Sequence, residues 1–132
     1  MRAFADTNIA VYAESDDAEK SKRARLIIEA APVISTQVVN ETVASLTTKY
    51  KFSKSDAYEV AAAPMDLSEV VAVSQSTVRQ AMSLAVRYQL SHWDALIVAA
   101  ALEAKCERLY SEDFQHQQVF DGRLTVNNPF LD

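Results

Sequence analysis

Four acidic residues stand where a carboxylate could take part in chemistry. They are Asp6, Glu41, Asp94 and Asp113, and each lies at or near a predicted element boundary. Carboxylate and water oxygens are the ligands that Mg²⁺ and Mn²⁺ prefer. If the four acids shared one cleft, each like-charged pair would cost about 4 kcal/mol at about 4 Å and an effective dielectric constant of about 20. Divalent cations would remove that repulsion and activate a water molecule, so this set predicts metal-dependent phosphodiester hydrolysis.

Asp6 and Asp113 also have purely structural interpretations. Asp6-Thr7-Asn8 follows a predicted strand and opens a helix, so Asp6 could be an N-cap that accepts hydrogen bonds from backbone N–H groups. Asp113 lies in a polar connection, where an aspartate usually stabilises a turn. Taken one at a time, both residues fit the structural interpretation better than the catalytic one.

For Asp94 and Glu41, the choice between a structural and a catalytic role depends on the helix that carries each residue. Ser91-His92-Trp93-Asp94 matches a capping box, yet it opens the most apolar helix of the chain, where a carboxylate is costly unless a cation compensates its charge. The apolar stripe expected on the helix of Glu41 consists of Val39, Val43, Leu46 and Tyr50. Glu41 falls on nearly the opposite side, so periodicity predicts that it faces solvent, although its place near the helix start still allows it to face a cleft above the sheet.

Short apolar runs alternate with helical patterns along the chain. The runs expected to form five strands are 2–5, 33–34, 70–73, 109–110 and 124–126. This alternation favours an α/β fold with a mainly parallel sheet covered on its faces. Ligand sites in such sheets lie outside the carboxyl ends of the strands, where Asp6 and Asp113 fall.

The helical patterns between these strands have recognisable starts and ends. One helix follows Asp17 as its N-cap, and another is opened by the capping box of residues 53–56 and closed by Pro64. A third is expected from about His92 to Lys105 and should be largely buried, because it is apolar nearly all round. The buried stripes predicted for two helices are Ala24, Ile27, Ile28 and Ala31, and Val78, Ala81, Met82 and Ala85.

Composition limits the class of protein. The 132 residues are 49% hydrophobic and 23% charged with one glycine, which favours a single domain over residues 1–132. The only cysteine, Cys106, has no partner for a disulfide, so a reducing cytoplasmic location is expected. The amino terminus has no signal-peptide pattern, and the longest apolar stretch, 95–102, is much shorter than the roughly 20 residues of a membrane span.

Any nucleic-acid binding must be local, because the formal net charge is −5. The basic residues considered as substrate contacts are Lys20, Lys22, Arg23 and Lys49. Such clusters are usually the solvated face of a helix, and that alternative stays open. His92, His116 and Cys106 are expected to have no catalytic role. Trp93 is expected to pack beneath the site, with stacking on a nucleobase as the alternative.

Four motifs taken together resemble the PIN-domain nucleases, in particular the VapC-like toxins of bacterial toxin–antitoxin pairs. The motifs are Asp6-Thr7-Asn8, Gln37-Val38-Val39-Asn40-Glu41, the stretch 90–97 around Asp94, and Leu109-Tyr110-Ser111-Glu112-Asp113-Phe114. Each is weak alone, but their order and spacing are typical of the family. The resemblance extends from the first strand to Phe130.

The resemblance implies a three-layer α/β/α PIN-like domain with a mainly parallel central sheet of about five strands. It also implies that Asp6, Glu41, Asp94 and Asp113 bind one or two Mg²⁺ or Mn²⁺ ions. Asp6 and Asp94 would be the principal ligands, Glu41 would position or deprotonate the attacking water, and Asp113 would hold a second ion directly or through water. Thr7, Asn8 and Ser111 would support the site.

The function implied is an endoribonuclease that cuts tRNA, rRNA or mRNA with a metal-activated water and is blocked by a cognate antitoxin. Relatives of this kind are commonly homodimers. The alternative is a catalytically silent PIN-fold module that binds a small partner protein. A phosphatase with Asp6 as its nucleophile is disfavoured, because that chemistry usually needs a second aspartate where Asn8 stands.

Overall fold

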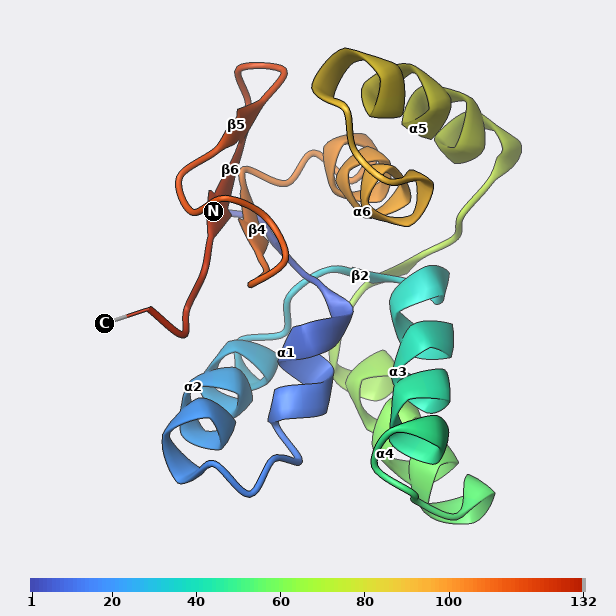
Figure 1. Cartoon of the computed structure of the whole chain (residues 1–132), viewed down its shortest axis with the longest axis vertical. Helices are drawn as coiled ribbons and strands as arrows, with labels where there is room; N and C mark the ends of the chain where they lie inside the picture. Colours follow the sequence, from blue (N-terminus) through green and yellow to red (C-terminus); the bar gives the residue numbers. More distant parts are fainter. Residues whose placement is uncertain (132) are drawn as a thin grey trace.

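Strands and helices alternate along residues 1–131, which are the residues that the computed structural model describes (Figure 1). In chain order the elements are β1 (Ala3–Ala5), α1 (Thr7–Tyr12), α2 (Ala18–Glu29), β2 (Ile34–Ser35), α3 (Thr36–Thr48), α4 (Lys54–Leu67), β3 (Val70–Val71), α5 (Gln75–Tyr88), α6 (His92–Glu103), β4 (Arg108–Tyr110), β5 (Val119–Phe120) and β6 (Leu124–Asn127). The expected α/β alternation is confirmed. Within these residues, no helix has the length and apolar character needed to cross a membrane.

The main sheet has four strands in the order β1-β4-β6-β5. The β1–β4 and β4–β6 pairs are parallel, and β5–β6 is antiparallel. A second parallel pair, β2–β3, is linked to β1 by a bridge between Phe4 and Val33. The mainly parallel sheet is therefore confirmed, but the described residues contain β5 in addition to the five expected strands. This two-residue strand leads into a tight hairpin in which Asp121 and Gly122 both adopt left-handed conformations.

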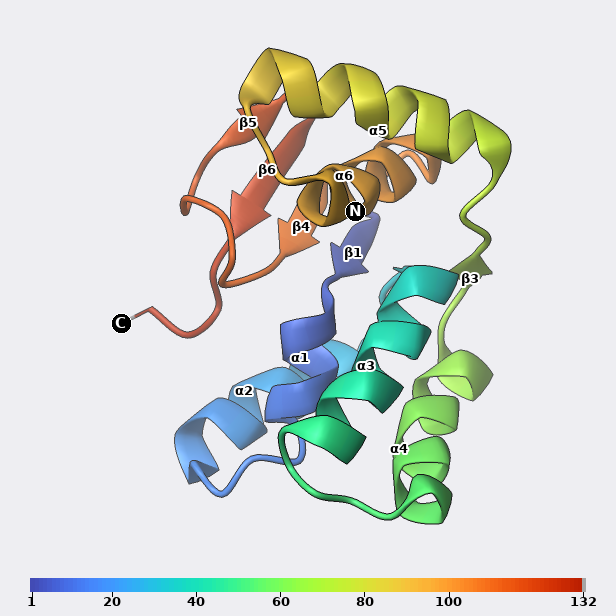
Figure 2. The same ribbon diagram turned by 45° about the vertical axis from the view of Figure 1, so that its right-hand side comes forward.

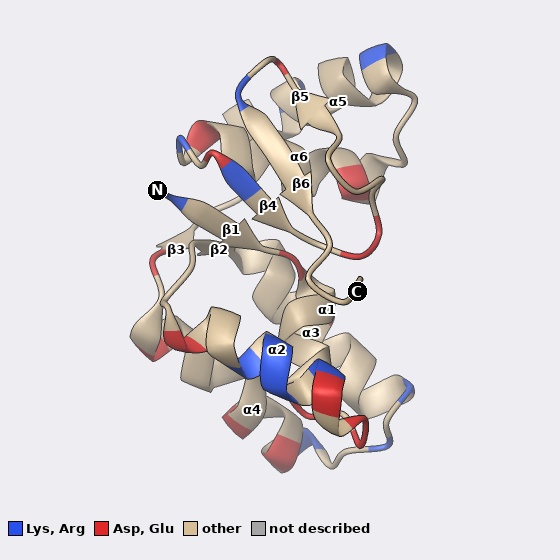
Figure 3. Cartoon of the chain, turned by 90° about the vertical axis from the view of Figure 1, so that its left-hand side faces the viewer, with Lys and Arg blue, Asp and Glu red and all other residues tan. Residues whose placement is uncertain are grey.

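Helices flank this sheet. In Figure 3, α5 and α6 lie behind β4–β6, whereas α2 lies at the front below β1. Strand residues that alternate along β4 and β6 are fully buried in the same hydrophobic core as α6, among them Leu109, Leu124 and Val126. The α6 residues from Ala95 to Leu102 are all buried, as predicted for this helix. Several of them are alanines, which allow α5 and α6 to pack closely (Figure 2).

Three helix predictions need correction. Pro64 does not close its helix but lies inside α4, because a proline in the last turns leaves only the Val60 carbonyl without its i+4 donor. On α5 the buried face is formed by Thr77, Ala81 and Leu84, while Met82 is 57% exposed. Ala31 lies beyond the end of α2 in a left-handed conformation and is exposed. The Asp17 N-cap of α2 is confirmed.

Candidate active site at the carboxyl ends of β1 and β4

Asp6 is held between the ends of two neighbouring parallel strands. It follows β1 and caps α1, with Oδ1 accepting a 2.7 Å hydrogen bond from the Thr7 backbone N–H. Its Oδ2 accepts a 2.7 Å bond from the hydroxyl of Ser111, which directly follows β4. Asp6 is only 3% exposed, and Ser111 is fully buried. The N-cap interpretation of Asp6 is correct, and the residue also lies where parallel sheets place their ligand sites.

Burial raises the pKa of Asp6 from its ordinary value to about 7. The hydrogen bonds from Ser111 and Thr7 act in the opposite direction, since they stabilise the carboxylate. The nearby charges of Asp113 and Glu41 add to the upward shift of the pKa. Asp6 is thus a buried acid that ionises near neutral pH and has two other acids close to it, a combination that favours a bound cation.

Asn8 connects α1 to the chain that follows β4. Its Nδ2 donates to Ser111 Oγ at 3.3 Å and to Asp113 Oδ2 at 3.2 Å. The backbone N–H of Asp113 also donates to Ser111 Oγ, at 3.0 Å. Asp113 is exposed, but these bonds fix it beside Asp6. Asn8 and Ser111 therefore lie where the resemblance expects them to support the site.

Glu41 faces α1 and not bulk solvent. Its Oε1 accepts a 2.8 Å bond from Thr7 Oγ1, and its Oε2 accepts a 3.2 Å bond from Gln37 Nε2. The orientation predicted from periodicity is wrong, because α3 buries Val38, Thr42 and Leu46. Val39 and Val43 are only half-buried, and Tyr50 lies exposed beyond the end of the helix. This rotation of the buried face turns Glu41 toward the acidic cluster.

Asp94 joins the cluster from the first turn of α6. Its backbone N–H donates to the Oγ of the N-cap Ser91 at 3.1 Å. Burial raises the pKa of the Asp94 carboxyl, and the charges of Asp113 and Glu41 raise it further. Since Asp113 and Glu41 also raise the pKa of Asp6, the four predicted acids share one electrostatic environment.

The acids are close enough to repel one another, but they do not form a complete set of metal ligands. Among residues 1–131, no group of three or more acidic, histidine or cysteine side chains is arranged to hold an ion. Mg²⁺ is commonly bound through one or two carboxylates, with its remaining positions taken by water and substrate phosphate. A donor set made only of carboxylates fits a hard divalent cation of this kind.

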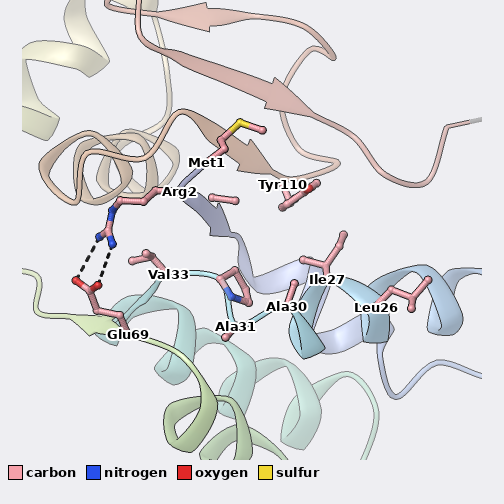
Figure 4. Close-up of a pocket in the computed structure, with 11 residues that line it drawn as sticks. Met1, Arg2, Leu26, Ile27, Ala30, Ala31, Val33, Glu69 and Tyr110 are labelled. Atoms are coloured by element: carbon pink, nitrogen blue, oxygen red, sulfur yellow. Dashed lines mark hydrogen bonds and ion pairs between the residues drawn. The ribbon is translucent and has the colours of Figure 1, made fainter.

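A groove of about 370 Å³ opens beside the acids, between α1 and α3. Its lining includes Thr7, Asn8, Glu41, Asp113 and Lys49. A larger pocket, of about 500 Å³, lies instead at the start of β1 (Figure 4). Its one acid, Glu69, forms a 3.2 Å ion pair with Arg2, and none of the four predicted acids lines it. Glu41 and Asp113 thus line the groove and not the larger pocket, whereas Asp6 and Asp94 line neither.

The four basic residues considered as substrate contacts lie in different surroundings. Lys49 lines the groove, whereas Lys20, Lys22 and Arg23 are not among the residues that line it. The Lys20 ammonium lies 4.6 Å from the centre of the Tyr12 ring. Arg23 donates 3.0 Å bonds to the backbone carbonyls of Pro129 and Leu131 and pairs with Glu19. Arg23 thus holds the carboxyl-terminal segment against α2, a structural role.

Sequence reasoning gave no role to Gln37, which the structure places between Glu41 and the start of α6. Besides Glu41, its Nε2 contacts the backbone carbonyl of Trp93 at 3.1 Å, so it links α3 to α6. The i, i+4 spacing of Gln37 and Glu41 on one helix was the signal that could have found this pair. Trp93 does not pack beneath the site, since it is 63% exposed.

Cys106, His92 and His116 do not line the groove beside the acids. Cys106 is buried, and burial raises the pKa of its thiol to about 11. His116 Nδ1 accepts a 3.0 Å bond from the backbone N–H of Asn128. His92 is an exposed residue in the first turn of α6.

The comparison with protein families agrees with this geometry. The family model for the PIN domain matches residues 3–120. The chain belongs to the PIN domain family. A search of curated proteins finds no match.

Solved structures with the same fold include several toxin–antitoxin proteins. A toxin–antitoxin complex from Klebsiella pneumoniae is 23% identical, with a TM-score of 0.72 over 97% of this chain and 98% of that chain. The sarcin-ricin loop cleaving toxin VapC20 from Mycobacterium tuberculosis is 23% identical, with a TM-score of 0.69 over 86% and 91%. VapBC2 from Rickettsia felis, bound to a promoter DNA fragment, is 16% identical, with a TM-score of 0.70 over 97% and 100%. At these identities the similarity shows the fold alone, and it confirms the expected PIN-type α/β arrangement.

Proposed function

We propose that this PIN-domain protein is a VapC-like toxin, an endoribonuclease that depends on Mg²⁺ or Mn²⁺. The observation that carries the proposal is the shared environment of Asp6, Glu41, Asp94 and Asp113 beside a groove at the carboxyl ends of β1 and β4. Family membership and the fold of the toxin–antitoxin complexes support it. So does the similarity to a toxin described as cleaving an RNA loop.

In this proposal the chain's own residues divide the work of hydrolysis. Asp6 and Asp94 would hold one ion, and Asp113 would contribute to a second ion directly or through water. The bound cation would acidify a coordinated water and stabilise the charge that develops on the phosphate. Ser111 and the Thr7 N–H fix the orientation of Asp6, while Thr7 Oγ1 and Gln37 Nε2 fix that of Glu41. Glu41 would position the attacking water and accept its proton while the water oxygen bonds to phosphorus and the P–O3′ bond breaks, and that proton would then pass to the departing 3′ oxygen.

The decisive experiment measures RNA cleavage by the wild type and by Asp6→Asn, with Mg²⁺ or Mn²⁺ and with EDTA. Asp56→Asn is a matched control, since Asp56 is an exposed aspartate in the first turn of α4. We expect cleavage only by the wild type and the control, and only with metal. Equal activity in all lanes would refute the proposal. An inactive wild type that binds a small partner protein tightly would favour the silent interaction module.

The proposal extends to the protein's partners and location. A cognate antitoxin would block the groove, and the enzyme would act in the cytoplasm as a homodimer. The similar structures that contain an antitoxin support the first of these points. We expect a short neighbouring reading frame that encodes a DNA-binding protein. Co-expression of that protein with this chain should protect cells. A toxic chain with no such neighbour would contradict the antitoxin part.

A further inference from the structure

Trp93 presents a large aromatic surface to solvent and directly precedes Asp94 in the first turn of α6. It is the only tryptophan of the chain, and it remains 63% exposed. The rest of its helix behaves differently, because α6 buries every residue from Ala95 to Leu102. An exposed indole gives up the free energy that its burial would provide, so its position is informative when it borders a site.

The backbone of Trp93 is anchored between two of the acids. Its carbonyl accepts a 3.1 Å bond from Gln37 Nε2, which also donates to Glu41 Oε2 at 3.2 Å. The next residue is Asp94, whose N–H is held by Ser91. The ring itself has an edge-to-face contact with the exposed His92, at 5.6 Å between centroids. Trp93 therefore combines a fixed main chain with a free aromatic face.

The charge of the molecule explains why an aromatic contact would be needed here. The net charge is −5, and the site consists of carboxylates, so the polyanionic backbone of RNA gains little from the protein except through cations. Stacking of a base on an aromatic ring needs no positive charge. It also requires an unpaired base, because a base inside a duplex has its faces covered.

Resting on the proposed nuclease function, we propose that Trp93 stacks on an unpaired nucleobase next to the phosphodiester at the acidic cluster. The indole is a specificity-determining surface that selects single-stranded or looped RNA. Trp93 contributes to substrate binding and not to proton transfer. Its removal should therefore raise KM and leave kcat nearly unchanged, as expected for binding energy shared by ground state and transition state.

Fluorescence tests the contact directly, because all tryptophan emission comes from Trp93. The wild type is titrated in EDTA with a 15-nucleotide mixed-sequence single-stranded RNA and with the blunt duplex of the same sequence. Anisotropy of the labelled RNA reports binding in parallel. We expect saturable quenching by the single strand and much weaker quenching by the duplex. Binding without quenching, equal quenching by both forms, or no binding would overturn the inference.

Variants separate this inference from the proposed function. Trp93→Leu should weaken single-strand binding by about tenfold or more, and Trp93→Phe should restore most of it. Tyr58→Leu is the matched control, because Tyr58 is 56% exposed and lies on α4, a helix that carries none of the four acids. Thermal melting checks that each variant folds.

Each combination of results has one meaning. Metal-dependent cleavage with an unchanged KM in Trp93→Leu would contradict the proposed Trp93 contact and support the proposed nuclease function. Quenching by the single strand, without cleavage in either metal, would support the Trp93 contact and contradict the proposed nuclease function. If Trp93→Leu weakened only the binding of a small partner protein, Trp93 would be a protein contact and the inference would be wrong.

Discussion

The hydroxyl of Ser111 donates a 2.7 Å hydrogen bond to Asp6 Oδ2 and so joins the ends of two strands that are 105 residues apart in sequence. Because β1 and β4 are parallel neighbours, both residues emerge at the same edge of the sheet. The same Ser111 oxygen accepts bonds from Asn8 and from the Asp113 backbone. One buried hydroxyl therefore sets the positions of two of the four acids.

Ser111→Ala should weaken metal binding most strongly near neutral pH. The bond from Ser111 lowers the pKa of Asp6, so its loss raises that pKa above about 7 and lets protons compete with the cation. A hydrogen bond to a charged group contributes about 1.5–3 kcal/mol, which corresponds to about tenfold or more in Mn²⁺ affinity. Calorimetric titration with Mn²⁺ at pH 7 and pH 9 checks this.

In that titration, the defect of Ser111→Ala should shrink at pH 9, where Asp6 is ionised in both proteins. Ser83→Ala, an exposed serine on α5, is the control and should bind like the wild type. Identical affinities for all three proteins at pH 7 would contradict the role given to Ser111.

Asp6→Asn should stabilise the metal-free protein at high pH. The pKa of Asp6 is raised on folding to about 7, so the folded state binds more protons than the unfolded state between roughly pH 4 and 7. The stability of the wild type should therefore fall as pH rises through this window, and Asp94 adds to the fall in the same direction. Asparagine cannot ionise, so Asp6→Asn should lose less stability over the window.

Thermal melts in EDTA at pH 5 and pH 8 measure this effect. The variant should gain in Tm relative to the wild type at pH 8 and much less at pH 5. Added Mn²⁺ should reverse the order at pH 8, because a ligand that binds only the folded state stabilises it by about 2.7 kcal/mol at 100 times its Kd. A wild type that is more stable at pH 8 than at pH 5 without metal would argue against the pKa of Asp6.

Gln37→Met should lower kcat more than it raises KM. Methionine keeps the length of the side chain but removes the Nε2 donor that holds Glu41 and the Trp93 carbonyl. Each hydrogen bond contributes about 0.5–1.5 kcal/mol, and more when the partner is charged, so a decrease of about tenfold in kcat is expected. Steady-state cleavage of one RNA by Gln37→Met, by the exposed control Gln75→Met and by wild type provides the measurement. A changed KM with normal kcat would show that Gln37 serves substrate binding alone.

The order of elements and the positions of Asp6, Ser111 and Asp113 could be predicted, because the ends of parallel strands follow from topology. The orientation of Glu41 could not. On α3 a threonine occupies a core position, since Thr42 is buried and its hydroxyl donates to the Val38 carbonyl at 2.7 Å. A hydrophobic pattern cannot detect a buried polar residue whose hydrogen bond is made inside its own helix. The predicted apolar stripe was therefore rotated toward Val39 and Tyr50.

The prediction that Trp93 packs beneath the site was wrong for the opposite reason. Apart from Asp94, the sequence from Trp93 to Leu102 is apolar, and pattern alone assigns such a residue to the core. In the structure the burial of α6 begins at Ala95, one residue after Asp94, and Trp93 remains outside it. Where a buried helix starts is decided by what covers its first turn, which is information that a local pattern does not contain.

Lys49→Gln should weaken RNA binding and reduce its dependence on salt. Lys49 is the one basic residue of the predicted set that lines the acidic groove, so it is placed to contact a phosphate. Loss of one phosphate contact should lower the slope of log KM against log salt by about 1, with kcat unchanged. Lys22→Gln is the control, because Lys22 is an exposed residue on α2 that does not line the groove. Equal salt slopes for both variants and the wild type would show that the RNA backbone does not contact Lys49. A reduced slope only in Lys22→Gln would show that the RNA binds along α2 instead.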